Sequence, residues 1–213
     1  MVTVVTAICI GIAQPFNGVE LSAIDKRPVA GDAAIRSFGI EGDMVGDPTV
    51  HGGRDMAVHH YPTDHYAGWD AWLGGHELLR KAASFGENLM STGLTERDVC
   101  IGDRFRFGTA LLEVSQPRQP CWKIEHRFDR KGMVARIVEQ GMCGWYYRVI
   151  EEGQARAGDS LRRDSRAQEE WSVARTFAAF LTTAKNTLAS DWRSLSALEP
   201  LSRSWRDKAA RHV

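Results

Sequence analysis

The sequence predicts a mainly β domain, folded as a closed barrel or a sandwich, followed by a small helical module. Up to about residue 163, short apolar runs alternate with glycine pairs and with Gly-Asp steps that begin at Gly31, Gly42, Gly46, Gly102 and Gly158. Glycine and aspartate favour turns, and frequent turns between short apolar runs are typical of barrels and sandwiches. Beyond residue 163 the chain contains no glycine and its segments suit helices. We therefore expect a β domain at residues 1–163 and a helical module at residues 164–213.

Seven segments have the composition of β-strands, and the first begins near the N-terminus. Val2, Val4, Thr6, Ile8 and Ile10 alternate along it, as in a strand with one buried face. No basic residue precedes this stretch and it is too short to cross a bilayer, so a strand is expected and not a signal peptide. The expected strands lie at residues 3–12, 34–38, 56–61, 104–107, 111–114, 146–151 and 160–162.

Two helices are expected within the β domain. One, at residues 63–73, follows Pro62 and precedes two glycines; the other, at residues 129–140, ends at Gly141. The helical module is expected to hold three more, at residues 172–181, 188–198 and 202–210, with Ser202 capping the last. About fifty residues form a marginal domain, so the module should dock on the barrel. DNA binding is disfavoured, because acidic residues interrupt every basic stretch of the module.

Composition narrows the class of protein further. Of the 213 residues, 43% are hydrophobic and 25% are charged, and 27 basic residues balance 27 acidic ones. A net charge of zero argues against a partner that is a nucleic acid or a membrane surface. The four cysteines form neither a Cys-x-x-Cys pair nor a zinc-ligand pattern, so a reducing, cytoplasmic location is expected.

A proline-rich loop, Ser-Gln-Pro-Arg-Gln-Pro-Cys at residues 115–121, is the first candidate for chemistry. Two prolines make its backbone stiff and extended. Cys121 ends the loop three residues after Arg118, and a nearby cation favours the thiolate form. The loop suits a soft metal ligand or an activated thiolate, although a turn with a buried, inert cysteine fits these residues as well.

A second candidate is the segment His51-Gly52-Gly53-Arg54-Asp55. Two glycines let backbone N–H groups approach an anion closely, and an arginine offers a guanidinium fork. The alternative is a plain turn with a solvated arginine. His51, with His59 and His60, also invites a histidine-metal interpretation, but the i, i+4 spacing of zinc hydrolases is missing.

The Gly-Glu-Asn turn at residues 86–88 is a third candidate. Asn88 offers both a donor and an acceptor to a heterocyclic ligand. Asp43, in a Gly-Asp step, could serve as a simple turn former or brace an arginine.

Five motifs in a fixed order resemble the MOSC family: Gly-Ile-Glu-Gly-Asp, His-Gly-Gly-Arg-Asp, Phe-Gly-Glu-Asn-Leu, Ile-Gly-Asp and Ser-Gln-Pro-Arg-Gln-Pro-Cys. MOSC domains are named after the C-terminal domain of molybdenum cofactor sulfurases. The chain is most similar to the stand-alone bacterial subgroup that reduces 6-hydroxylaminopurine and other N-hydroxylated compounds. The resemblance covers residues 3–163, and the helical module resembles the three-helix extension of that subgroup.

The resemblance implies a β-barrel that binds a pyranopterin molybdenum cofactor, with Cys121 as the ligand of the metal. Cofactor contacts map onto His51, Gly52, Gly53 and Arg54 and onto Ser115, Gln116 and Arg118. Asn88 is added as a cofactor contact because of the donor and acceptor of its amide. A basic residue, Lys26 or its neighbour Arg27, is implied as well. The family motif usually places proline at position 54 and arginine at position 56, so Arg54 is a weaker candidate than Arg118.

The predicted function is reduction of N-hydroxylated bases, amidoximes or hydroxylamines, with Cys121 as a permanent metal ligand. His59, His51 and Asp55 are candidate proton donors, because histidine titrates near neutrality. No flavin, haem or nicotinamide motif is visible, so a separate reductase is expected to supply electrons, to either a monomer or a homodimer. Two alternatives remain open: a sulfur-transfer enzyme with a persulfide on Cys121, and a non-catalytic carrier of the cofactor.

Overall fold

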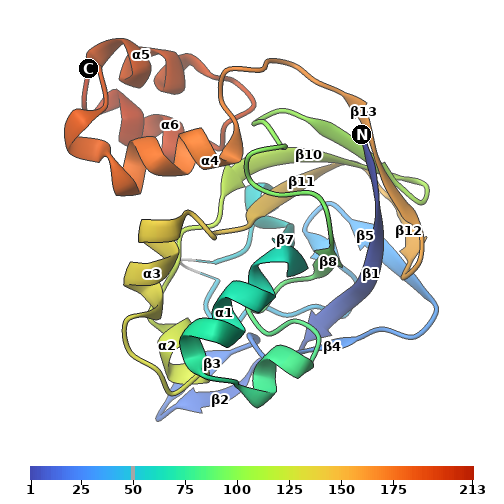
Figure 1. The fold of residues 1–213 in the computed structure, drawn as a ribbon. Helices are drawn as coiled ribbons and strands as arrows, with labels where there is room; N and C mark the ends of the chain where they lie inside the picture. The colour runs from blue at the N-terminus through green and yellow to red at the C-terminus, as the bar shows by residue number, and fades with distance from the viewer. Residues whose placement is uncertain (49–50) are drawn as a thin grey trace.

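The computed structural model describes residues 1–48 and 51–213 and confirms the closed barrel (Figure 1). Its strands follow the order β13-β9-β10-β11-β7-β8-β1, and pairing of β1 with β13 closes the ring. β4 extends from the edge of β1, while β12-β5-β6 and β2-β3 form two smaller sheets. β7 and β8 pair in parallel, whereas every other pairing of these strands is antiparallel.

The strand bounds agree with the seven expected segments and add short strands that the sequence did not reveal. The strands are β1 (Val2–Gly11), β2 (Gln14–Asn17), β3 (Glu20–Ser22), β4 (Lys26–Pro28), β5 (Asp32–Arg36), β6 (Gly39–Ile40), β7 (Val58–Pro62), β8 (Leu89–Ser91), β9 (Arg104–Phe107), β10 (Ala110–Pro117), β11 (Trp145–Glu151), β12 (Gly153–Arg156) and β13 (Ser160–Ser165). The added strands have two to four residues, which is too short for an alternation to stand out in the sequence.

The strand β10 leads into the proline-rich loop, and all eight of its residues are buried. One side of β10 faces the interior of the barrel, and α4 of the helical module packs near it. Its polar residues Ser115 and Gln116 are therefore enclosed by protein on both sides. Because β10 pairs with β9 and β11, the loop begins from a rigid part of the barrel.

Both helices expected within the β domain are present. A 3-10 turn (Thr63–His65) precedes α1 (Tyr66–Leu73), and α3 (Met133–Gln140) ends at Gly141 in a left-handed conformation. A further helix, α2 (Lys123–Arg127), starts two residues after Cys121. It was missed because five residues are too few to show helical spacing. Two more 3-10 turns cover Arg54–Met56 and Glu77–Arg80.

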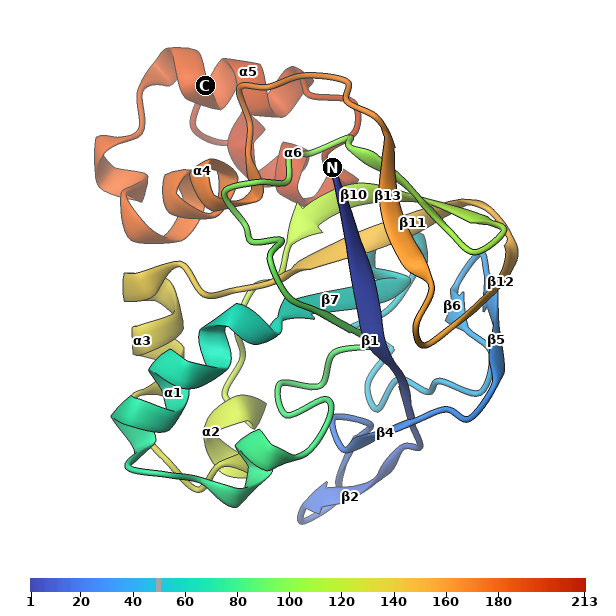
Figure 2. The ribbon, with the colours of Figure 1, turned by 45° about the vertical axis from the view of Figure 1, so that its right-hand side comes forward.

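The three helices of the module are also present and lie beside β10 (Figure 2). They are α4 (Val173–Phe177), which continues as a π-helical turn (Ala178–Thr182), then a 3-10 turn (Ala184–Asn186), α5 (Ala189–Ala197) and α6 (Arg203–Ala210). Ser202 does occupy the N-cap of α6, but its side chain makes no capping hydrogen bond, so that detail of the prediction was wrong.

The module contacts the proline-rich loop directly. The backbone N–H of Ser202 donates to the carbonyl of Ser115 at 2.9 Å, and Nζ of Lys208 donates to Oε1 of Gln119 at 3.0 Å. At the other end of the contact, Gly102 lies so close to Pro200 that a Cβ would come within 2.9 Å of it. The expected docking of the module on the barrel is therefore seen, and it takes place at the loop that bears Cys121.

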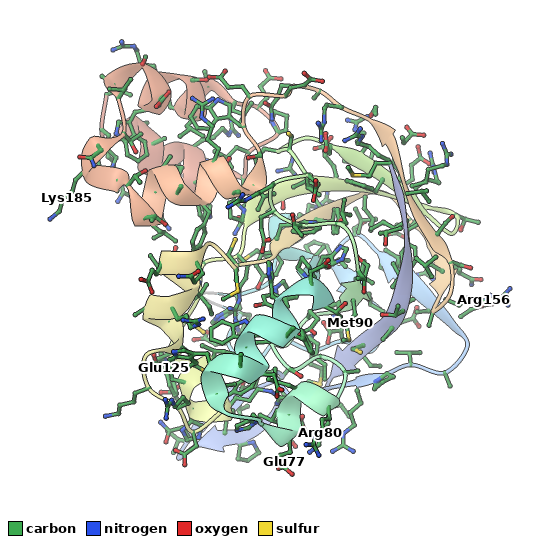
Figure 3. All side chains as sticks on the ribbon, viewed as in Figure 1. Glu77, Arg80, Met90, Glu125, Arg156 and Lys185 are labelled. Carbon is green, nitrogen blue, oxygen red and sulfur yellow. The ribbon has the colours of Figure 1, made fainter. Side chains whose placement is uncertain are left out.

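Charged side chains are spread over the surface, as Glu77, Arg80, Arg156 and Lys185 illustrate by pointing outward from different elements (Figure 3). Within residues 1–48 and 51–213, no helix has the length and apolar character needed to cross a membrane.

Candidate functional site

A cleft at one end of the barrel gathers seven of the predicted site residues. Its volume is about 810 Å³ when the space open to solvent is included. The predicted residues that line it are Lys26, His51, Gly52, His59, Asn88, Arg118 and Cys121. They come from β4, from β7 and the segment before it, from the turn before β8 and from the proline-rich loop. Residues far apart in the sequence thus converge on one opening.

The burial and hydrogen bonding of Arg118 indicate which kind of ligand suits this cleft. Arg118 is only 6% exposed, and its Nη1 atom is buried without a hydrogen-bond partner. Among the residues that the structure describes, no carboxylate forms an ion pair with it. A buried guanidinium that keeps an unsatisfied N–H group is costly, and an anionic ligand would lower that cost. The cleft is therefore suited to an anion.

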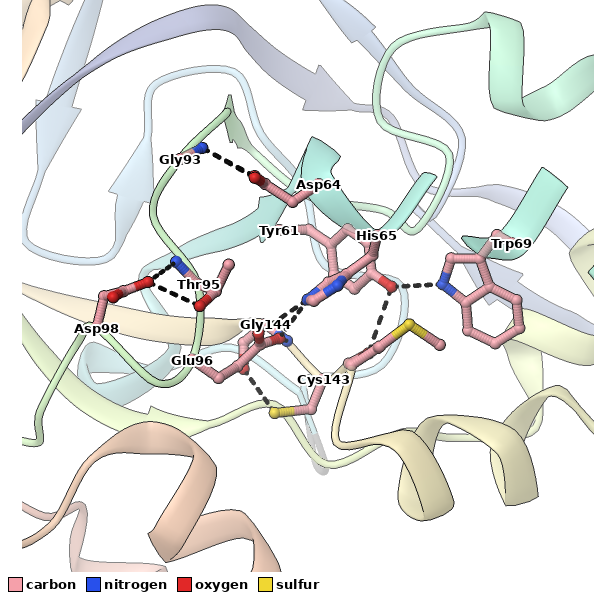
Figure 4. A network of polar contacts seen from close by, with 11 residues as sticks. Tyr61, Asp64, His65, Trp69, Gly93, Thr95, Glu96, Asp98, Cys143 and Gly144 are labelled. Carbon is pink, nitrogen blue, oxygen red and sulfur yellow. Dashed lines mark hydrogen bonds and ion pairs between the residues drawn. The ribbon is translucent and has the colours of Figure 1, made fainter. Parts of the chain in front are cut away.

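The buried carboxylate of Glu96 supports the backbone of Arg118, and its contacts with His65 and Gly144 are drawn in Figure 4. Glu96 accepts hydrogen bonds from Nε2 of His65 at 2.8 Å and from the backbone N–H of Gly144 at 2.6 Å. The carbonyl of Gly144 in turn accepts the backbone N–H of Arg118 at 3.1 Å. This chain of contacts fixes the backbone of Arg118 in the proline-rich loop.

A larger residue in place of Gly144 would force the neighbouring backbone to move. The φ of Gly144 is +68°, and a Cβ would lie 2.5 Å from the carbonyl oxygen of His60. Neither Gly144 nor Glu96 was identified from the sequence, because single residues outside any motif give no signal of a shared contact.

Cys121 lies at the edge of the cleft and has a lowered pKa of about 7. Burial alone would raise the pKa. The hydrogen bond from His51, the charge of Arg118 and the backbone N–H of Lys123 outweigh burial and favour the thiolate. The comparison with Cys9 is informative, because burial raises the pKa of that thiol to about 12. Cys121 is thus set apart chemically as an available thiolate.

Two lysines add positive charge to the cleft. Lys123, in α2, is 8% exposed and donates to the carbonyl of Leu21 at 3.0 Å. Lys123 was missed in the sequence because the helix α2, which positions it, was missed.

Lys26 forms an ion pair with Asp43, so Asp43 braces a lysine and not an arginine. The side chain of Arg27, in contrast, is 85% exposed and is directed away from the cleft toward Asp25. Of the two basic candidates, Lys26 is the one at the cleft.

Asn88 lines the cleft but its amide is engaged in holding the barrel together. Its Nδ2 group donates to the carbonyl of Cys9 at 3.0 Å and to Oδ2 of Asp43 at 2.8 Å. Its Oδ1 atom accepts the backbone N–H of His59 at 3.0 Å. With both amide protons already used, a role in donating to a heterocycle is not supported by this geometry.

The neighbouring residues His59 and His60 face opposite sides of β7, as strand geometry requires. His60 points inward, where Nδ1 lies 3.1 Å from the hydroxyl of Tyr147 and Nε2 lies 2.8 Å from Oγ of Ser91. Burial lowers its pKa to about 3. His59 faces the cleft, and its Nε2 atom is buried without a partner.

Burial, aided by the charge of Arg118, lowers the pKa of His59 well below its usual value. The expectation that this histidine titrates near neutrality is therefore wrong. His59 is neutral at pH 7, with a ring hydrogen bond to the backbone of Gly86 and a second nitrogen left free. A free nitrogen on a neutral imidazole can contact a bound ligand by hydrogen bonding without carrying a charge.

Five other predicted residues do not line the cleft. Asp55 forms an ion pair with Arg148 at 2.8 Å, so it is no longer a candidate proton donor. The hydroxyl of Ser115 lies 2.5 Å from the carbonyl of Asp55 and 3.0 Å from that of Tyr146, and therefore clamps the wall. The remaining three are Gly53, which is exposed; Arg54, which is exposed and lies against the ring of Phe38; and Gln116, which is buried in β10.

The histidine-metal interpretation finds no support in the geometry. Within residues 1–48 and 51–213, no group of three or more His, Cys, Asp and Glu side chains is arranged to hold a metal ion. What the site offers is a single thiolate beside cations. The fold and the cleft therefore define a closed β-barrel protein whose cleft is suited to an anion and has, at its edge, a cysteine with a lowered pKa.

Comparison with known proteins identifies the family. The model of the MOSC domain matches residues 47–162, about half of the chain. The uncharacterized protein YflK of Bacillus subtilis is 43% identical over 192 residues, which cover 90% of this chain and 85% of YflK. The crystal structure of YiiM from Geobacillus stearothermophilus superposes with a TM-score of 0.84 at 31% identity, covering 99% of this chain and 98% of that one.

A third relative, from Gibberella moniliformis, is called a reductase. It is 37% identical over 159 residues, which cover 74% of this chain but only 28% of the fungal protein. The chain belongs to the MOSC family and, within it, to the stand-alone bacterial subgroup that includes the YiiM proteins.

Proposed function

We propose that this protein is an oxidoreductase that uses a molybdenum cofactor to reduce N-hydroxylated compounds. The observation that supports it most is the presence, in one cleft, of a buried arginine with an unsatisfied Nη1 atom and of a cysteine whose pKa is lowered to about 7. A thiolate is the ligand that a soft metal centre selects, and a guanidinium is suited to phosphate. The relative called a reductase favours oxidoreductase chemistry.

The residues present fit such a cofactor. Cys121 would hold the metal, while Arg118 and Lys123 would meet the anionic part of the cofactor. Gly52, at φ +83°, would let the backbone approach it closely. When bound, the cofactor supplies the two-electron chemistry that cleaves an N–O bond. Tyr146, whose ring is tilted against that of His59 with 5.0 Å between centroids, would help exclude water from this end of the cleft.

The overall reaction takes a hydroxylamine, two electrons and two protons to an amine and water. The electrons would come from a separate reductase, and the protons would pass through groups of the cleft. His51, at hydrogen-bonding distance from Cys121, is the remaining histidine candidate for this role. His59, held neutral, would orient a ligand through its free nitrogen and not act as an imidazolium.

A direct test loads the protein with cofactor during expression and measures molybdenum content and reduction of benzamidoxime or 6-hydroxylaminopurine with an artificial reductant. Cys121→Ser should lose molybdenum and activity together. Cys100→Ser, which alters a buried thiol in another part of the barrel, is the matched control. Full activity in Cys121→Ser would refute the proposal, and tight cofactor binding without turnover of any N-hydroxylated substrate would identify a carrier instead.

The lowered pKa of Cys121 also favours a second candidate, a sulfur-transfer enzyme. In that case Cys121 would carry a persulfide that passes its outer sulfur to an acceptor. Mass spectrometry of the protein after incubation with a sulfur donor would show a gain of one sulfur at Cys121. The absence of that adduct, together with N–O reduction by the loaded protein, would dismiss this candidate.

A further inference from the structure

The mouth of the cleft is surrounded by apolar side chains that the barrel leaves uncovered. Phe38 lines the cleft with 67% of its surface exposed, and Met44 and Val45 line it with 47% and 40% exposed. A single exposed apolar residue is ordinary on a protein surface. Three around one opening, above a floor that carries Arg118 and Lys123, indicate contact with an apolar part of a ligand.

The turn that carries Phe38 is held rigidly although its ring is exposed. Both the backbone N–H and the hydroxyl of Ser37 donate to Oε1 of Glu152, at 2.8 and 2.6 Å. On the other side, Gly39 has a φ of +139°, and a Cβ there would lie 2.9 Å from the carbonyl of Ala57. The ring therefore stands on a fixed backbone, so little ordering remains to be done when a ligand binds.

Arg54 is stacked on this ring. Its guanidinium carbon lies 5.5 Å from the centroid of Phe38, and the residue is otherwise exposed. The guanidinium covers one face of the ring, and with 67% of Phe38 still exposed the other face is open to a ligand. The N–H groups of a guanidinium lie in its own plane, so stacking on a ring leaves them able to donate. Phe38 and Arg54 thus offer a flat apolar face next to a row of hydrogen-bond donors.

We propose that Phe38 and Arg54 determine specificity by recognising the planar heteroaromatic part of an N-hydroxylated substrate. The substrate ring would stack on Phe38, and a nitrogen or oxygen acceptor at its edge would bond to Arg54. Met44 and Val45 would shield the ring from water. This inference rests on the proposed reductase activity and gives Arg54 a substrate contact in place of the cofactor contact expected from the sequence.

The kinetic test compares two substrates of the cofactor-loaded protein: 6-hydroxylaminopurine, which has a planar ring, and hydroxylamine, which has none. Phe38→Leu keeps an apolar side chain but removes the aromatic face, and Arg54→Gln removes the guanidinium. Stacking of a base on an aromatic side chain contributes about 1–3 kcal/mol, so Phe38→Leu should lower the ratio of the two kcat/KM values about tenfold, mainly through KM. Leu188→Ala, at a 65% exposed position of the module, is the control.

A binding measurement provides a readout that needs no turnover. The fluorescence of 2-aminopurine should be quenched when it stacks on the loaded protein, and Phe38→Leu should weaken that binding about tenfold. An unchanged kcat/KM ratio together with unchanged 2-aminopurine binding would overturn the inference. Failure of the wild-type protein to reduce either substrate would instead refute the proposed function, and the 2-aminopurine titration would still decide whether Phe38 binds planar rings.

Discussion

The cleft of the barrel and the cavity of the helical module are both concave, yet they differ in how far their polar groups are satisfied. Five buried side-chain nitrogens lack a partner in the part of the chain that the structure describes; two of these, on His59 and Arg118, line the cleft, and none lies in the module. Half of the residues that line the cavity of the module are apolar, namely Phe180, Leu181, Trp192 and Trp205, and its cations are at the surface.

The difference separates a binding site from a supporting element. Buried polar groups normally find partners, so the two nitrogens of His59 and Arg118 that lack a hydrogen-bond partner in the cleft indicate that a ligand supplies the missing contact. The buried aromatic rings of the module pack against one another, so they contribute to the stability of the fold and do not form a binding site. The module still matters for the cleft, because it contacts Ser115 and Gln119 of the proline-rich loop. Four predictions test this division, from the largest expected effect to the smallest.

Trp205→Ala should reduce the free energy of unfolding by about 3–5 kcal/mol, because it leaves a large cavity in the core of the module. Trp205 is 2% exposed and packs against Phe180, with ring centroids 4.6 Å apart. Urea denaturation followed by tryptophan fluorescence measures the change, with Leu188→Ala as the exposed control. A separate early transition of the module, with an unchanged barrel, would show that the two regions are stable independently.

Arg118→Met should lower molybdenum retention about a hundredfold, since loss of one partner from a buried charge contact costs several kcal/mol. The same change should leave the cofactor-free protein as stable as the wild type or more stable, because it removes an unpaired buried charge. Metal analysis and urea denaturation measure the two effects, with the exposed Arg97→Met as control. A large loss of stability without cofactor would mean that Arg118 is a structural residue.

Alkylation of Cys121 by iodoacetamide in the cofactor-free protein should reach half its maximal rate near pH 7. A lowered pKa means that the thiolate is already present at neutral pH, and the rate should fall about tenfold per pH unit below that point. Burial raises the pKa of Cys9, Cys100 and Cys143, so these thiols should stay unreactive over the same range. His51→Ala should move the midpoint upward; a wild-type midpoint near 9 would contradict the proposed environment of Cys121.

Lys208→Ala should have the smallest effect, about 0.5 kcal/mol or less on the free energy of unfolding. Its hydrogen bond to Gln119 lies at the surface, where such contacts contribute little. Thermal denaturation measures the change in stability relative to wild type, and metal analysis measures the molybdenum content of the variant. A marked loss of molybdenum would show that this contact, and not the barrel, positions the proline-rich loop.

Much of this protein followed from local signals in the sequence. Alternation in residues 2–10 predicted the first strand, Gly141 predicted the end of α3, and the absence of glycine after residue 163 predicted the helical module. Five ordered motifs identified the family. These features depend on near neighbours in the chain, which is why sequence patterns report them.

The tertiary structure decided which residues meet, because contacts between distant segments leave no periodic trace. Only the fold shows that Lys26 and not Arg27 faces the cleft, that Asp55 is committed to Arg148, and that His59 is held neutral by burial. It also shows that Glu96, through Gly144, positions Arg118. Burial and pairing set the charge state of a side chain, and both are properties of the folded barrel, not of the residue alone.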